Sequence, residues 1–221
     1  MNPPFTVEQF FDVFRHYNEV VWPAQAALVA IGAIAALAAI HANVRRSWRS
    51  VQVAIVSLAA LWLWAGIVYH KTFFVVLTPA GEIFGSLFIA EAALLLISLW
   101  QGGPAFEPAP RPGLIVGLVL LAYALVGYPV LGYALGQRYP AVPSFGAPCP
   151  TTIFTFAIFC LLPASIPRFA MAIPVLWALI GSYAGIRFGV GEDLGLPVAA
   201  VAAMIVIHEA THRATPRYTH V

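Results

Sequence analysis

The sequence is poor in charged residues. Only 9% of its 221 residues are Asp, Glu, Lys or Arg, against about 25% in soluble domains, so it cannot cover a globular surface with charge. The net charge of +2 is too small to indicate nucleic-acid binding. No motif for nucleotides, haem attachment or lipidation occurs, and we expect no cofactor. The first residues, MNPPFTVEQFFDVFRHYNE, contain no signal peptide.

Apolar residues, by contrast, are abundant and grouped. They make up 61% of the chain, the mean hydropathy is +0.87, and runs of about 19 residues recur, the length that crosses a ~30 Å hydrocarbon core. This pattern predicts an all-α, polytopic transmembrane bundle in one domain, residues 1–221, embedded in the lipid bilayer of the cell inner (plasma) membrane. We expect about seven spans, at 23–42, 51–69, 79–100, 113–136, 151–163, 169–187 and 194–212.

The fifth of these spans is short for a full crossing. It could be tilted or begin inside the membrane, and six spans with a re-entrant piece is the alternative. Orientation follows from Lys and Arg, which are enriched in cytoplasmic loops. With the loop around residues 43–50 inside, seven basic residues are cytoplasmic and four are external, which predicts an external N-terminus and a cytoplasmic C-terminus.

Ahead of the first span, residues 5–20 predict an amphipathic helix lying in the membrane interface. Aromatic and aliphatic residues recur there at helical spacing, and Thr6 followed by Gln9 has the spacing of a capping box. Such a helix serves as an interfacial anchor or as a lid over a neighbouring opening. The pattern alone favours the anchor.

The segment YPAVPSFGAPCPTTIFT at residues 139–155 contains four prolines, which predict extended backbone up to a helix start near Thr151. Pro150 would then be the first helical residue and Cys149 its cap. Extended backbone at membrane depth requires protein or a water-filled cavity around it. We therefore place a substrate site here, with Cys149, Thr151 and Thr152 at the helix start; a rigid connection that closes the bundle is the alternative. Within one helix, Cys149 and Cys160 would lie ~16 Å apart, too far for a disulfide.

Three segments of the sequence carry a family resemblance: YNEVVWPAQ at 17–25, GAPCPTTIFTF at 146–156 and FGVGEDLGL at 188–196. Together they resemble a family of small bacterial integral membrane proteins known only as a domain of unknown function. The resemblance runs from about Phe5 to Val201 and implies a multi-pass fold without implying a reaction. The family pattern does not include the later motif HEATHR.

Further polar residues gather at the outer ends of the predicted spans. Asn18, His70 and Glu82 join the predicted substrate site as lining of an outward vestibule. Glu82 also suits the first turn of its helix, where a carboxylate complements the helix dipole. Glu192 and Asp193 are better explained as residues of a solvated loop.

Glu91 stands near the middle of the third predicted span. A charge there costs at least ~2.5–3.5 kcal/mol, so this side chain should face protein or water and carry a proton. No Lys or Arg is expected at matching depth. Neutral hydrogen-bond partners are available on other spans, so Glu91 is either a proton carrier or interhelical glue; the candidates are Ser57, Trp62, Tyr123 and Tyr183.

The motif HEATHR at 208–213 places His208, Glu209 and His212 at the spacing of zinc proteases. His41 is expected at the same end of the bundle and could complete a three-histidine site. Such a site resembles the seven-span zinc hydrolases that act on ceramides and related amides, but the SxxxH that accompanies it in that group is missing. Basic residues at a helix C-terminus give a simpler explanation, which we favour.

Three functions remain open from the sequence. The one we favour is transport or permeation of a small solute or ion through an outward site near residues 139–155 and the buried acid Glu91. The second is a zinc-dependent membrane hydrolase built on HEATHR. The third is a non-catalytic accessory protein that associates with partner membrane subunits.

Overall fold

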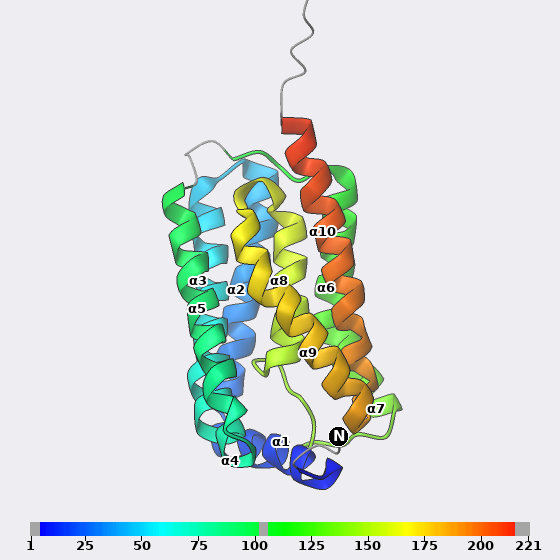
Figure 1. Cartoon of the computed structure of the whole chain (residues 1–221). Helices are drawn as coiled ribbons and strands as arrows, with labels where there is room; N and C mark the ends of the chain where they lie inside the picture. The colour runs from blue at the N-terminus through cyan, green and yellow to red at the C-terminus, as the bar shows by residue number, and fades with distance from the viewer. Residues whose placement is uncertain (1–4, 102–105, 215–221) are drawn as a thin grey trace, which may run out of the picture.

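Helices form every regular element in residues 5–101 and 106–214, which are the residues that the computed structural model describes (Figure 1). In chain order they are α1 (Val7–Val21), α2 (Ala24–Arg45), α3 (Trp48–Trp64), the π-helix η1 (Ala65–Phe74), α4 (Val75–Leu77), α5 (Ala80–Gln101), α6 (Arg111–Ala122), the π-helix η2 (Tyr123–Gly127), α7 (Tyr128–Ala134), α8 (Pro148–Leu161), the short η3 (Pro163–Ser165) and η4 (Arg168–Met171), α9 (Ala172–Phe188), η5 (Gly191–Leu194) and α10 (Gly195–Ala214).

Six of the helical stretches are long and apolar enough to cross a membrane, which makes this a multi-pass membrane protein. They are Ala24–Arg45, Trp48–Leu77, Ala80–Trp100, Arg111–Ala134, Arg168–Phe188 and Gly191–Ala210. The predicted helical class is confirmed. The second span is longer than predicted, because α3, η1 and α4 continue without a break past residue 69. Its continuation places His70 and Lys71 within a helix instead of a loop.

The remaining predicted span is the short helix α8, which lies in the centre of the bundle (Figure 1). Every residue of α8 except Cys149 is buried. The chain reaches it from the end where α7 lies, through an extended stretch that runs into the bundle, and leaves α8 at the opposite end. The extended segment and α8 together cross the bundle from one end to the other. Helix α8 begins inside the bundle, which agrees with the second of the two alternatives for the short span, a helix that begins inside the membrane.

The start of α8 differs from the prediction. The helix begins at Pro148, with Ala147 as its N-cap, so Cys149 lies in the first turn and not at the cap. Prolines are compatible with a first turn because its backbone N–H groups have no partner within the helix. The four prolines therefore delay the helix less than the sequence suggested.

Two asparagines form hydrogen bonds to the two ends of this crossing segment, one to the extended stretch and one to the end of α8. Asn18 of α1 donates from Nδ2 to the carbonyl oxygens of Pro140 (2.6 Å) and Val142 (2.8 Å), and its Oδ1 accepts from Ser144 and Gln25. Asn43 of α2 donates to the carbonyl of Leu161 at the C-terminal end of α8. Each asparagine thus satisfies backbone groups that the extended segment or the helix end leaves unpaired.

Helix α1 lies across one end of the bundle, roughly perpendicular to the spans, and α10 ends at the other (Figure 1). Its capping box between Thr6 and Gln9 is present as predicted. The interfacial anchor favoured from the sequence stays a prediction. The aromatic face of α1 packs on protein, where Phe10 stacks on Phe188 with ring centroids 4.4 Å apart and Phe14 on Tyr69 at 5.7 Å.

The opposite placement of α1 and the end of α10 leads to a topology prediction. Reporter fusions within residues 45–49 and after Val221 should both give cytoplasmic signals, because the densest basic cluster marks the cytoplasmic side. An external signal at Val221 would contradict an odd number of crossings.

A second prediction concerns Asn18. Asn18→Asp removes both donors to the carbonyls of Pro140 and Val142 and sets a carboxylate beside them. Each buried group left unpaired costs about 1–3 kcal/mol, so the unfolding temperature in detergent should fall by several degrees. Glu19→Gln, at the exposed neighbouring position, is the control and should leave it unchanged. Equal unfolding temperatures for the two variants would argue that the hydrogen bonds from Asn18 to the extended segment do not stabilise the fold.

Candidate functional site

A small, largely enclosed cavity of about 60 Å³ lies beneath α1, where the extended segment turns into α8. Four spans contribute to its lining, and α1 covers it as a roof. Its polar lining residues are Tyr69, His70, Cys149, Trp177 and Asp193, and rings of Phe10, Phe14, Phe74 and Phe84 complete the wall. The sequence predicted two of these polar residues, His70 and Cys149, as members of one site.

His70 is placed by the π-helix η1. Helices of this kind are rare and are frequent at functional sites; here the N–H of Val75 donates to the carbonyl of His70, five residues earlier. The helix packs closely on α5, since a Cβ added at Gly66 would lie 2.9 Å from the carbonyl oxygen of Gly85. His70 is 1% exposed, and neither of its ring nitrogens has a hydrogen-bond partner in the protein.

Trp177 and Cys149 meet over Gly181 of α9. A Cβ added at Gly181 would lie 3.3 Å from Cys149 Sγ and 3.5 Å from Trp177 Nε1, so both groups converge on the space that the glycine leaves. The Trp177 indole N–H is buried without an acceptor. Its ring lies 5.0 Å from that of His70, centroid to centroid. Two buried rings with unpaired nitrogens therefore stand side by side in the cavity wall.

The burial of Glu192 and Asp193 is the main difference between the structure and the sequence-based prediction of this site. They are 1% and 3% exposed, and are not loop residues in solvent. The Tyr128 hydroxyl donates to Asp193 Oδ1 at 2.5 Å, and Gln137 donates to Glu192 at 3.0 Å. Short η5 carries both residues into the bundle, where these donors from the α7 region offset the loss of water.

The roof of the cavity is held by an aromatic contact and a hydrogen bond. Phe10 and Phe14 of α1 are buried against the bundle, and the Trp64 indole donates to the Tyr17 hydroxyl at 2.8 Å. Burial raises the pKa of Tyr17 to about 12, although the Trp64 hydrogen bond opposes this, so the hydroxyl stays neutral under physiological conditions. These contacts hold α1 over the cavity, a position that is compatible with both roles considered from the sequence, the anchor and the lid.

Other residues predicted to line the substrate site lie elsewhere. Asn18 is the clamp on the extended segment. Glu82 is 57% exposed and pairs with Lys71 at 2.6 Å. Thr151 and Thr152 are buried within α8, outside the cavity lining; Thr152 donates to the carbonyl of Pro148, whereas Thr151 Oγ1 has no partner in the protein. Neither cysteine is in a disulfide, as predicted.

Glu91 of α5 is buried, 0% exposed, and is separate from the cavity lining. Neither carboxylate oxygen has a hydrogen-bond partner in the protein. Three of the four partners proposed from the sequence are engaged elsewhere or exposed. Trp62 donates to Thr155, Tyr123 donates to the carbonyl of Glu192, and Tyr183 is exposed. The sequence suggested that Glu91 could join two helices by a hydrogen bond, and no such hydrogen bond is present.

The HEATHR motif falls at the far end of α10. His208 and Glu209 are exposed, and the side chain of His212 lies outside the described residues, as does the tail histidine His220. His41 Nδ1 lies 2.8 Å from the Ser50 hydroxyl oxygen. Among the described side chains, no three His, Cys, Asp or Glu residues are grouped to hold a metal ion.

Comparison with known proteins identifies the family. Residues 7–217 match the model of a family of unknown function, DUF6064. The chain belongs to this family. The matched region confirms the resemblance drawn from the sequence and continues past residue 201 to include HEATHR. No curated protein and no solved structure matches the chain.

Trp177 and Asp193 are the functional candidates of this family member that sequence reasoning missed. Asp193 stood inside FGVGEDLGL, one of the segments that carry the family resemblance, but its acidic neighbours suggested a loop. Trp177 gave no separate signal in an apolar helix. Together with His70 and Cys149, these residues offer hydrogen-bond donors and acceptors to a bound solute, in a site that excludes bulk water.

The roof leads to a prediction on access to the cavity. In a Cys160→Ser background, Phe10→Ala with Phe14→Ala should speed labelling of Cys149 by a thiol reagent in nanodiscs at least about tenfold. Each buried Phe→Ala change costs ~3–5 kcal/mol, and 1.4 kcal/mol is tenfold in an equilibrium constant. Val7→Ala, on the exposed face of α1, should leave the rate unchanged. Equal rates with and without the two phenylalanines would contradict a lid.

Proposed function

We propose that the protein carries a small polar solute or ion across the membrane, and that the enclosed cavity is where this solute binds. The observation that carries the proposal is the unpaired state of His70 and Trp177 in the cavity wall. A buried polar group without a partner costs about 1–3 kcal/mol. Residues that served only to pack the bundle would be satisfied or apolar, and a solute with donor and acceptor groups offsets this cost when it binds.

The dimensions and charge of the cavity define the solute. Its volume of about 60 Å³ is small, so the solute has few heavy atoms unless the lid moves. Asp193 contributes a carboxylate, and no Lys or Arg belongs to the described lining. An anion would face this carboxylate without a counter-charge, and a neutral or cationic solute fits better.

A second, more open cavity of about 310 Å³ provides a route toward the first. It lies between α7 and the extended segment and is lined by Glu192, Gln137 and Tyr139, among others. Pro143 borders both cavities, and Tyr128 lines the second while donating to Asp193 in the first. Because this hydrogen bond joins a residue of each lining, we propose it as the gate between the two cavities.

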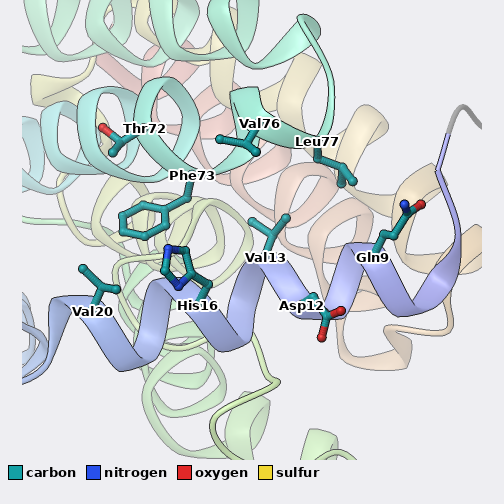
Figure 2. Close-up of a pocket in the computed structure, with 9 residues that line it drawn as sticks. All are labelled: Gln9, Asp12, Val13, His16, Val20, Thr72, Phe73, Val76 and Leu77. Atoms are coloured by element: carbon teal, nitrogen blue, oxygen red, sulfur yellow. The ribbon is translucent and has the colours of Figure 1, made fainter.

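The lid has room to move on one side. A groove of about 570 Å³ separates part of α1 from the end of the second span, with Asp12 and His16 on one wall and Thr72 and Val76 on the other (Figure 2). His16 and Phe73 meet at this groove, with ring centroids 5.4 Å apart. In the proposed opening, α1 moves away from the cavity and gives up its contacts with the second span, such as the stack of Phe14 on Tyr69 and the Trp64–Tyr17 hydrogen bond.

The distribution of basic residues extends the proposal to orientation. The cavity and its lid lie at the end of the bundle with fewer basic residues, which by the positive-inside tendency is the external side of the plasma membrane. Arg45, Arg46 and Arg111 occupy the other end, at the termini of α2 and α6. In this arrangement the site opens outward when α1 lifts.

Proteoliposome swelling tests the proposed function. Stopped-flow light scattering would follow gradients of water-soluble probes: glycerol, urea, formamide and ammonium chloride. At least one should enter wild-type vesicles at least tenfold faster than protein-free vesicles. Gly181→Leu should abolish the difference, because its first added carbon would lie 2.8 Å from Leu196 Cδ1 and 3.3 Å from Cys149 Sγ, so the leucine side chain would displace Leu196 and fill the space beside Cys149.

The matched control is Ile186→Leu, on the exposed face of the same helix α9. It should behave like the wild type. Wild-type vesicles that swell no faster than protein-free ones with every probe would contradict the proposed function. Unchanged flux through Gly181→Leu would show that the solute uses another path.

A further inference from the structure

The carboxyl group of Glu91 is the buried polar group that the proposed solute site leaves unexplained. It is 0% exposed, and both of its oxygens lack a partner in the protein. An ionised carboxylate in such surroundings would cost several kcal/mol without a counter-charge. Glu91 therefore carries its proton in this closed arrangement. A residue kept only for packing would be better replaced by Leu or Met at this position.

Charged groups on the neighbouring elements do not offer Glu91 a counter-charge. Helices α3, η1, η4 and α9 pack on α5. Their titratable side chains are Arg49, Tyr69, His70, Lys71, Arg168, Tyr183 and Arg187. Lys71 pairs with Glu82 near the start of α5, and Arg49, Arg168, Tyr183 and Arg187 are exposed. Tyr69 packs in the aromatic cluster under α1, which leaves His70 as the base among them that is both buried and unpaired.

Phe88 connects Glu91 to this histidine. It lies three residues before Glu91, on the same face of α5 and ~4.5 Å nearer the lid along the helix axis. Its ring contacts those of His70 and Trp177, with centroid distances of 4.7 Å and 4.9 Å. Phe88 is not part of the cavity lining. It therefore stands as an apolar barrier behind the cavity wall, with Glu91 one helical turn beyond.

We infer that Glu91 is an exchangeable proton site that couples solute movement to a proton, with His70 as its exchange partner. This inference rests on the proposed function for the solute and adds the coupling ion. When the Phe88 ring moves aside, the proton leaves the Glu91 carboxyl and binds a free ring nitrogen of His70. The products are a carboxylate and an imidazolium whose opposite charges stabilise each other. The imidazolium then releases its proton into the cavity, and Glu91 regains one from the opposite side.

Infrared spectroscopy of the protein in lipid tests the proton site without knowledge of the solute. At neutral pH the spectrum should contain a carboxylic-acid C=O band that is missing in Glu91→Gln and kept in Glu82→Gln, the exposed glutamate of the same helix. In D₂O the wild-type band should shift within minutes, as exchange with the cavity requires. A spectrum without this band, or a band that stays unshifted for hours, would overturn the inference; the D₂O measurement needs no variant.

Coupling is tested in pyranine-loaded vesicles with the probe that swells them. Inward flux of that probe should change the luminal pH in wild type and in Glu82→Gln. In Glu91→Gln the pH change should fall at least tenfold while swelling persists. An equal pH change in wild type and Glu91→Gln would refute coupling and leave the proposed solute path standing. Failure of every probe to swell the vesicles would refute the solute path. The infrared measurement would then still test whether Glu91 carries an exchangeable proton.

Discussion

Backbone that is not helical must find hydrogen-bond partners within the protein when it enters a membrane, because hydrocarbon offers none. The extended segment before α8 meets this requirement through Asn18, whose side chain reaches two of its carbonyl groups and two neighbouring side chains. Since the segment is held inside the bundle, α8 begins below the end of the spans. That in turn puts Cys149 level with His70, and leaves beneath α1 the space that becomes the cavity.

The buried polar groups of the bundle differ in whether they have hydrogen-bond partners, and we use this difference to separate structural from functional candidates. Asn18, Asn43 and Glu192 have partners that join distant parts of the chain. His70, Trp177 and Glu91 have none. Unpaired polar atoms on His70, Trp177 and Glu91 make an unfavourable desolvation contribution that the hydrogen-bonded asparagines do not. This is the distribution expected when stability is given up locally for a site.

Much of the fold could be read from the sequence. Long apolar runs located the spans, and the capping box of Thr6 and Gln9 located α1. The π-helix at His70 could not be predicted from the sequence, and neither could the close approach of Gly66 to Gly85, where η1 packs on α5. The burial of Asp193 likewise depends on Tyr128 from another helix. His70 and Cys149 were recognisable as unusual polar residues near span ends, whereas Trp177 became recognisable only through its neighbours.

The complete burial of α8 has a consequence for how the protein is made. A helix of 14 residues rises about 21 Å, short of the ~30 Å that a lipid bilayer asks of an independent span. With no face turned to lipid, α8 cannot rest in the bilayer as a separate inserted segment and wait for its neighbours. For this part of the chain, insertion and tertiary assembly are a single event, in which α2, α6, α9 and α10 form the compartment that receives α8 during biogenesis.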